Sequence, residues 1–472
     1  MLFNTLDFWL FFAVVYGVYR LLGTRGQNLW LLGMSYVFYG FWDYRFVFLL
    51  ALSTSVDWLL ARRISREPSR TGAKKWVAVS VTVNLLFLGA FKYFNFFVGS
   101  FAALLEALGL RAHLPVIEIL LPVGISFYTF QSMSYIVDVY RGDVEPSASL
   151  VEFALFVAFF PHMVAGPIMK AKVLLPQMAR ARLISASDVT EGFHLAMVGL
   201  FKKVVVGDNL NTVVEMVFNR QLGFVPGALH LGALAFAFQI YADFSGYSDI
   251  ARGVARMMGF TLMENFETPY FATSITDFWH RWHISLSSWL REYLYIPLGG
   301  NRGTTLSTYR NLMITMVLGG LWHGAAAHYV WWGAYQGGLL AVERWFRGRG
   351  GAKADSGRTA GPVRWIQGFA TFHLVCLGWI LFRAEPGQPL GTMALRFINP
   401  AGWLAMPWAH LGPVLLTIAP LLILDLARRW SKRDLAILAL PWPVRGGLYA
   451  TLAYAFILLG QFESDAFIYF RF

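Results

Sequence analysis

Cysteine is almost absent from this sequence of 472 residues. Its one cysteine, Cys376, lies within an apolar run, so an intrachain disulfide and a cysteine-based metal site are both excluded. We expect packing to bury the Cys376 thiol. Two histidines considered below, His283 and His323, lack carboxylate or cysteine companions at the spacing of a metal motif such as HExxH. We therefore predict no metal and no other bound cofactor.

Charged residues are scarce as well. They make up 14% of the chain, whereas soluble globular proteins contain about 25%. No polar linker divides the chain, so we predict a single transmembrane domain over residues 1–472. The chain has a net charge of +12, which we attribute to basic loops that face membrane lipids. We therefore do not expect nucleic acid as a partner.

Apolar runs recur along the chain, and a helix of roughly 20 apolar residues crosses a bilayer. The first run lacks a basic flank and a small-residue cleavage site, so we expect a retained span rather than a signal peptide. The candidate spans lie near 6–22, 28–43, 46–61, 76–91, 93–109, 117–139, 149–168, 191–207, 228–251, 311–343, 365–382, 411–427 and 447–461. Glycine and proline interrupt residues 120–128 and 160–167, which predicts re-entrant segments. We predict an all-α integral membrane protein with ten to twelve transmembrane helices plus re-entrant and amphipathic helices.

Lysine and arginine gather in four loops, and cytoplasmic loops carry the excess of these residues. The four groups are Arg62, Arg63, Arg66, Arg70, Lys74 and Lys75; Lys170, Lys172, Arg180 and Arg182; Arg344, Arg347, Arg349, Lys353, Arg358 and Arg364; and Arg428, Arg429, Lys432, Arg433 and Arg445. If all four are cytoplasmic, both termini lie on the opposite, periplasmic side. Residues 348–362, rich in Gly, Ala and charge, are expected to form a flexible cytoplasmic loop.

Residues 278–293 show the clearest amphipathic pattern. Seven apolar residues, Phe278, Trp279, Trp282, Leu286, Trp289, Leu290 and Tyr293, fall on one stripe at 100° per residue, which predicts one helix along an interface or a polar interior. His283 lies at the edge of the stripe, where it could reach a cavity, whereas His280 lies on the polar side. An anchor helix whose histidines bond lipid headgroups is the alternative.

His323 lies inside a long apolar run, and a titratable group at membrane depth is a functional candidate. Gly319, Gly320 and Gly324 surround it, which favours close helix packing or close approach of a ligand. A neutral imidazole, with an ordinary pKa of about 6.5, can take a proton from a hydroxyl. His283 and His323 could therefore share a cavity as a general-base pair.

Several blocks of this sequence resemble the membrane-bound O-acyltransferase (MBOAT) family, and within it the bacterial alginate and peptidoglycan O-acetyltransferase-like branch. The similar motifs span nearly the whole chain. They are Lys92-Tyr93-Phe94-Asn95-Phe96-Phe97, residues 121–131, Phe159-Phe160-Pro161-His162, Gly199-Leu200-Phe201-Lys202-Lys203, residues 241–249, Asn265-Phe266, residues 278–303, Trp322-His323-Gly324 and the tail residues 467–470.

This resemblance implies helices around a central tunnel that reaches both faces of the membrane. It implies His323 and His283 as catalytic residues. The same motifs make Trp322, Arg281, Asn265 and Asp243 candidate substrate-binding residues. The expected reaction takes acetyl from cytoplasmic acetyl-CoA and passes it outward, across the bacterial inner membrane, to a periplasmic acetyltransferase or polymer-modifying partner, or to an alginate-like polysaccharide itself.

Other functions stay open on the sequence alone. A D-alanyl or long-chain acyl transferase would share the fold, and the width of the tunnel beside His323 would distinguish the long-chain enzyme. A polymer or ion transporter would also use Gly and Pro breaks, but no related pair of broken helices is visible. The sequence does not identify the polymer, the partner or a covalent acetyl carrier.

Overall fold

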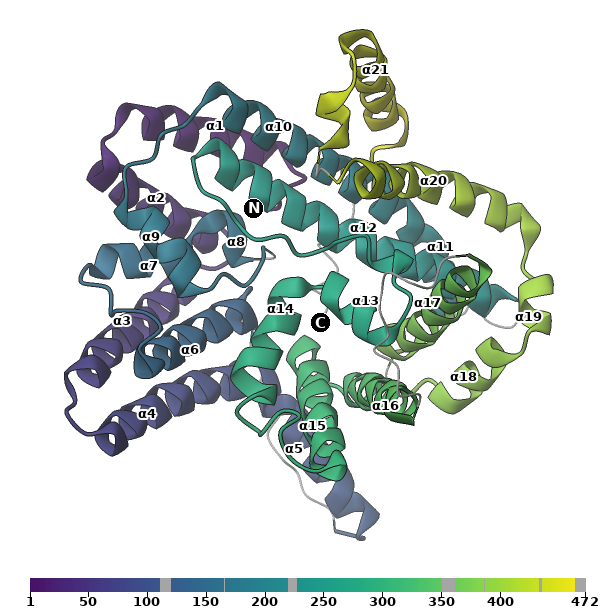
Figure 1. Ribbon diagram of the computed structural model, residues 1–472, viewed down its shortest axis with the longest axis horizontal. Helices are drawn as coiled ribbons and strands as arrows, with labels where there is room; N and C mark the ends of the chain where they lie inside the picture. Colours follow the sequence, from purple (N-terminus) through teal and green to yellow (C-terminus); the bar gives the residue numbers. More distant parts are fainter. Residues whose placement is uncertain are drawn as a thin grey trace. The chain divides into compact units, whose positions relative to one another are not determined.

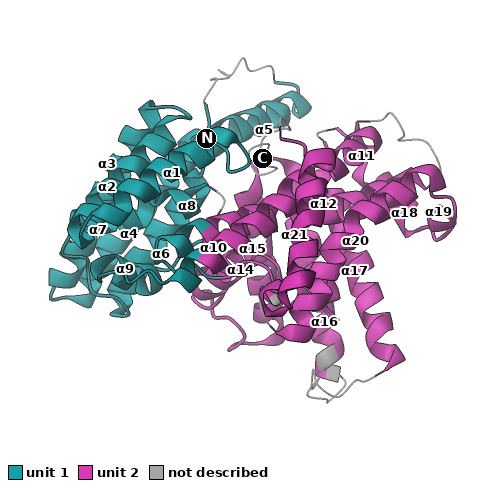
Figure 2. Ribbon diagram, turned by 90° about the horizontal axis from the view of Figure 1, so that it is seen from above, with its two compact units in different colours: residues 1–189, 254–263 teal, residues 190–253, 264–472 magenta. Residues whose placement is uncertain are grey.

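The computed structural model describes residues 1–110, 120–164, 166–219, 227–349, 361–385, 387–432 and 435–462. Every regular element in these ranges is a helix, which confirms the predicted all-α fold (Figure 1). The chain forms two compact units, coloured separately in Figure 2. Unit 1 comprises Met1–Val189 and Val254–Met263, and unit 2 comprises Thr190–Gly253 and Glu264–Phe472.

Unit 1 is built from six longer helices followed by three short ones. They are α1 (Leu6–Leu21), α2 (Thr24–Gly40), α3 (Arg45–Arg66), α4 (Arg70–Leu88), α5 (Phe94–Ala107), α6 (Ile125–Arg141), α7 (Leu150–Ala158), α8 (Phe160–Met163) and α9 (Ala171–Ala179). The predicted division between 76–91 and 93–109 is wrong. A π-helical turn, η1 (Gly89–Tyr93), joins α4 to α5, because Gly89 keeps a right-handed helical conformation instead of ending the helix.

The two segments predicted to be broken by Gly and Pro are indeed interrupted, and they meet each other. Gly124 takes φ +73° immediately before α6, and a Cβ at this position would lie 2.6 Å from the carbonyl oxygen of Met163. The chain between α7 and α8 is also non-helical. Glycine is thus required at position 124 both for its backbone conformation and for this close approach. Whether the segments re-enter the bilayer stays a prediction.

Unit 2 holds most of the remaining helices, with the start of α10 and the end of α12 in unit 1. They are α10 (Ala186–Phe201), η2 (Lys202–Gly207), α11 (Asp208–Phe218), α12 (Ala228–Met257), η3 (Pro269–Phe271), α13 (Ile275–Arg281), α14 (Ile284–Leu290), η4 (Arg291–Tyr295), α15 (Thr305–His323), α16 (Ala327–Arg349), α17 (Pro362–Arg383), α18 (Leu390–Ile398), α19 (Ala401–Leu404), α20 (Trp408–Ser431), η5 (Ala436–Ala439) and α21 (Trp442–Leu459).

Two predicted helices of unit 2 are each divided. The single helix expected over 278–293 is wrong, because the chain leaves helical geometry at Trp282 and His283, between α13 and α14. The run 311–343 forms α15 and α16, since Gly324 is extended with φ −164° and ψ 155°.

Close packing of α15 against α16 depends on glycine. A Cβ at Gly320 would overlap the carbonyl oxygen of Tyr329, and one at Gly333 would overlap the carbonyl oxygen of Met316. The two backbones therefore approach more closely than any side chain permits. This confirms helix packing as a role for the glycines before His323.

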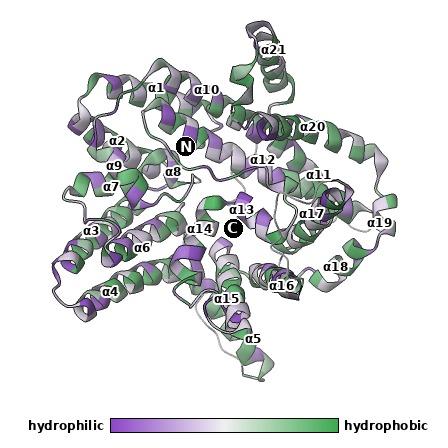
Figure 3. Ribbon diagram, in the orientation of Figure 1, coloured by the Kyte–Doolittle hydropathy of each residue, from purple (hydrophilic) through white to green (hydrophobic). Residues whose placement is uncertain are grey.

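Hydrophobic colour extends along the helices of both units (Figure 3). By length and composition, three helical stretches of the described residues could cross a membrane: Arg70–Ala107, Pro362–Arg383 and Trp408–Ser431. The ten to twelve spans, the single domain, the position of the termini and the central tunnel stay predictions. Most of the loop 348–362 and the tail 467–470 lie outside the described residues.

Candidate active site

His323 is the last residue of α15, and its side chain is almost entirely buried, with 5% exposed. Three aromatic rings meet the imidazole edge-on. The ring centroids of Trp322, Trp332 and Phe382 lie 5.0, 5.2 and 5.1 Å from its own, at interplanar angles of 81° to 89°. Since these rings come from α15, α16 and α17, the packing of three helices fixes the orientation of the imidazole.

His283 occupies the break between α13 and α14. It has φ +44° and ψ +54°, in the left-handed region that residues other than glycine rarely adopt. Its carbonyl oxygen accepts the Ser287 N–H at 2.9 Å and so starts α14. The side chain is 1% exposed. A strained, buried histidine at a helix junction is typical of a position that function selects.

Asn265 holds this junction through its main chain and its side chain. Its carbonyl oxygen accepts the Ile284 N–H at 3.0 Å. Its side-chain oxygen Oδ1 accepts the Ser285 N–H at 3.1 Å and the Ser285 hydroxyl at 2.9 Å. Its amide nitrogen Nδ2 donates to Ser248 Oγ at 3.3 Å.

The same oxygen defines the tautomer of His283. Asn265 Oδ1 lies 3.2 Å from His283 Nδ1, and the backbone N–H of Ser285 can only donate, which identifies the atom facing both groups as an oxygen. In the neutral imidazole, Nδ1 therefore carries the proton, and the lone pair lies on Nε2. The arrangement prepares Nε2 to accept a proton.

Trp322 contacts both histidines. Its ring centroid is 5.8 Å from that of His283 and 5.0 Å from that of His323. These ring contacts and the Asn265 contact to His283 connect the four residues. That the two histidines share a cavity as a general-base pair stays a prediction.

Arg281 and Asp243 form other interactions. The Arg281 guanidinium pairs with Asp277 at 2.7 Å and donates to the Glu267 carbonyl oxygen at 3.4 Å. Asp243 pairs with Lys203 at 2.8 Å, and Lys203 also pairs with Asp208 at 2.7 Å. These contacts give both residues a structural role, and their assignment to substrate binding stays a prediction.

Several side chains of the site were not predicted from the sequence. Ser285 had a usable signal, because it follows His283 by two residues within the same motif. Trp332 and Phe382 pack on His323 from helices that follow it. Phe244 meets the His283 ring edge-on at 4.6 Å. No spacing in the sequence indicates these last three contacts, since they depend on how α12, α16 and α17 pack.

The class of protein follows from a comparison with known families, and the apolar helices of the described residues agree with it. The sequence model of the MBOAT, membrane-bound O-acyltransferase family matches residues 144–373. With the relatives described next, this shows that the chain belongs to that family, as its motifs predicted. It is a membrane protein and an O-acyltransferase.

Individual members of the family match a larger part of the chain. The probable alginate O-acetylase AlgI of Pseudomonas aeruginosa is 48% identical over 395 residues, which cover 84% of this chain and 74% of that protein. The peptidoglycan O-acetyltransferase of Helicobacter pylori is 33% identical over 419 residues, covering 82% and 77%. The teichoic acid D-alanyltransferase of Bacillus subtilis is 29% identical over 296 residues, covering 58% and 72%.

Proposed function

We propose that this O-acyltransferase takes acetyl from cytoplasmic acetyl-CoA and passes it across the bacterial inner membrane for O-acetylation of an extracytoplasmic polysaccharide. The observation that carries the proposal is the pair of buried histidines that both contact the Trp322 ring. The 48% identity to an alginate O-acetylase supports acetyl as the group and an alginate-like polymer as the destination.

The reaction is an exchange of a thioester for an ester. The oxygen of the acceptor hydroxyl bonds to the acetyl carbonyl carbon while His323 takes the hydroxyl proton. The carbon–sulfur bond then breaks, and the departing thiolate receives that proton, which gives the ester and free CoA. The Asn265 contact to Nδ1 holds the His283 imidazole in place. Its Nε2 is then a second basic atom that can accept the same hydroxyl proton.

The aromatic surroundings of His323 support this role in a second way. Rings of Trp322, Trp332 and Phe382 exclude bulk water from the imidazole. Water that reached the thioester would hydrolyse it, so a dry site favours transfer to the acceptor over loss of acetyl. The acceptor is the polymer, or a periplasmic acetyltransferase that modifies it.

Transfer of D-alanyl is the second candidate function. The similarity to a teichoic acid D-alanyltransferase favours it, since that relative shares 29% identity over 72% of its length. The chemistry at the histidines would be the same, and only the acyl group and the acceptor would differ.

The test compares substitutions at two histidines, the buried His323 and the exposed His280. Inner-membrane vesicles containing wild-type protein, His323→Ala or His280→Ala receive labelled acetyl-CoA on the cytoplasmic side, and label in the polymer is counted. A lost general base slows acyl transfer by about 100-fold or more, so we expect His323→Ala to fall at least that far. His280 is exposed, so His280→Ala should keep wild-type transfer.

The amount of each variant in the membrane, and its elution as a single species after solubilisation, establish that it is folded. Transfer by His323→Ala at more than a tenth of the wild-type rate would contradict the proposal. Incorporation of labelled D-alanine instead of acetyl by the wild-type vesicles would select the second candidate.

A further inference from the structure

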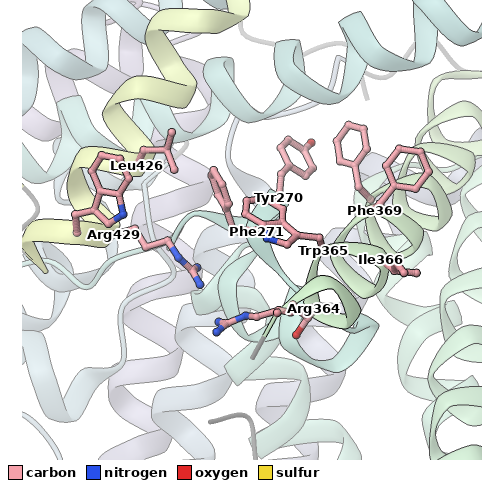
Figure 4. A pocket seen from close by; sticks show the side chains of 13 residues that line it. Tyr270, Phe271, Arg364, Trp365, Ile366, Phe369, Leu426 and Arg429 are labelled. Atoms are coloured by element: carbon pink, nitrogen blue, oxygen red, sulfur yellow. The ribbon is translucent and has the colours of Figure 1, made fainter. Parts of the chain in front are cut away.

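A cavity of about 930 Å³ lies in unit 2 where the N-terminal part of α17, the C-terminal end of α20 and the turn around η3 meet (Figure 4). Its lining residues include Arg364, Trp365, Phe369, Arg429 and Trp430. Both helices are among the three stretches long and apolar enough to cross a membrane. The cavity therefore lies at the ends of two candidate spans, where lipid headgroups would be found if both helices cross the membrane.

One part of the cavity is cationic. The side chains of Arg364 and Arg429 point toward one another across it (Figure 4), and the Arg429 guanidinium lies 5.7 Å from the centroid of the Phe271 ring. The charged groups that act on Arg429 are Arg364, Arg281, Asp277 and Glu267. Asp277 is paired with Arg281 at 2.7 Å, which leaves Arg364 and Arg429 against the one carboxylate of Glu267, a net positive charge beside the cavity.

Gly361, the N-cap of α17, lines the cavity together with Arg364. Pro362, the first residue of the helix, has no N–H, and the Arg364 N–H donates to the Gly361 carbonyl oxygen at 3.2 Å. The donors that suit a phosphate are therefore the arginine side chains. A phosphate group between the two arginines would meet donors from both helices.

Several other lining residues are apolar and exposed. Trp365 and Trp430 are 77% and 80% exposed, and Ile366 and Phe369 are similarly open. Tryptophan is enriched where a membrane meets water, and side chains this open on a candidate span face lipid. A cationic end next to an open apolar wall complements an amphipathic ligand with a phosphate head and a hydrocarbon chain.

We propose that this cavity binds one anionic phospholipid, with its phosphate between Arg364 and Arg429 and an acyl chain along Trp365 and Phe369. Basic pockets between membrane helices on the cytoplasmic side suit such lipids, and the basic loops predict that this end of α17 and α20 faces the cytoplasm. The site depends on the membrane fold and the lining residues, and it does not rest on the proposed reaction.

A lipid fits the cavity better than the acyl donor does. Neither His283 nor His323 lines the cavity. Ring contacts connect Tyr270, which lines it, to Trp282, then to Trp379, Trp332 and finally His323. The three tryptophans are fully buried, so packed rings separate the cavity from the imidazole that a donor thioester would have to reach.

The test measures lipid binding by the purified full chain in neutral detergent. Labelled phosphatidylglycerol is titrated into wild type, Arg364→Gln, Arg429→Gln, the double variant and Arg344→Gln, with labelled phosphatidylcholine, which is zwitterionic with no net charge, as the comparison. Losing both charge-assisted contacts should weaken phosphatidylglycerol binding at least about tenfold. Arg344, an exposed arginine of α16 that does not line the cavity, should be replaceable without effect.

Each result decides the proposal. Saturable binding of phosphatidylglycerol that the double variant loses would support it, as would weak binding of phosphatidylcholine. Equal binding of both lipids, or unchanged binding by the double variant, would overturn it. Displacement of phosphatidylglycerol by free CoA, with loss of CoA binding in the double variant, would assign the cavity to the donor instead. If the double variant aggregates, Arg364→Gln alone must weaken binding, because Arg364 is exposed and its replacement leaves the helices intact.

Discussion

His283 combines a proposed proton acceptor with a backbone conformation that costs free energy. A residue with a Cβ is about 1–2 kcal/mol less stable in the left-handed region than in the right-handed one. The Asn265 main chain and the Ser285 contacts hold the junction in this conformation. The backbone of His283 is thus strained at the junction that orients its imidazole.

This strain predicts an unusual order of stability at position 283. His283→Gly should be about 1 kcal/mol more stable than His283→Ala, because glycine adopts φ +44° without steric cost. Both variants should lose acyl transfer. Thermal unfolding in detergent, with the transfer assay beside it, measures both effects.

Position 280 provides the matched control. His280 lies within α13, where glycine is less favourable than alanine by about 1 kcal/mol, so the order should reverse there. Greater stability of His283→Ala than of His283→Gly would show that the junction is unstrained.

The sequence predicted some residues of the candidate site but not all of their contacts. The motifs indicated His283, His323, Trp322 and Asn265, and the structure places these four in one neighbourhood. The ion pairs of Arg281 and Asp243 were not foreseen. The partner of Arg281 is four residues away, a common helical spacing, but the partner of Asp243 lies on a different helix. Sequence spacing carries no information about such a long-range pair.

At the scale of elements, apolar periodicity predicted helices well and their ends poorly. The stripe over 278–293 continues across the break at His283, because α13 and α14 both bury apolar faces within unit 2. One residue in a left-handed conformation changes the chain direction without changing the pattern. Likewise, the apolar run 311–343 gave no indication that a helix ends before Gly324, where α15 stops.

The packing of α15 on α16 predicts a strong effect of one methyl group. Gly320→Ala should destabilise the protein by about 1–3 kcal/mol, because the new Cβ overlaps the Tyr329 carbonyl oxygen and the backbones must separate. Since His323 is on the same helix, acyl transfer should fall as well. The midpoint of thermal unfolding in detergent gives the loss of stability.

Gly338 is a suitable comparison on α16, because a Cβ there meets no atom within 4 Å. Gly338→Ala should leave the unfolding temperature unchanged or raise it slightly. An equal response of the two glycine positions would mean that the close approach at Gly320 does not limit stability.

On the scale of the whole molecule, the sequence predicted a helical membrane protein correctly but could not count its spans. Many apolar runs were expected to cross the bilayer, whereas three described stretches meet a strict test of length and apolarity. Helices that pack against one another carry buried polar residues, such as Asp57 in α3 and Lys202 in η2. These residues lower the mean hydropathy of an interior helix, so composition alone cannot separate spans from other buried helices.

The predicted topology can be tested with single cysteines, since the chain has only Cys376 to remove and that residue is buried. In a cysteine-free background, Tyr44→Cys, between α2 and α3, should react with a membrane-impermeant maleimide added to spheroplasts. Thr71→Cys, in the basic region that begins α4, should react only after the membrane is disrupted. The positive-inside distribution of charge is the reason for the difference.

Labelling of both cysteines after disruption is the necessary control, because it shows that each is accessible. Labelling of Thr71→Cys in intact spheroplasts would reverse the predicted orientation and would place both termini on the cytoplasmic side.

Buried lysines and aspartates form two ion-pair clusters in unit 2. Lys203 pairs with both Asp208 and Asp243, while Lys202 and Arg252 share Asp249. The first cluster has one cation for two carboxylates, and the second has two cations for one carboxylate. A neutral replacement at Lys203 would therefore strand two negative charges away from water, and only a compensating change in an aspartate would restore the balance.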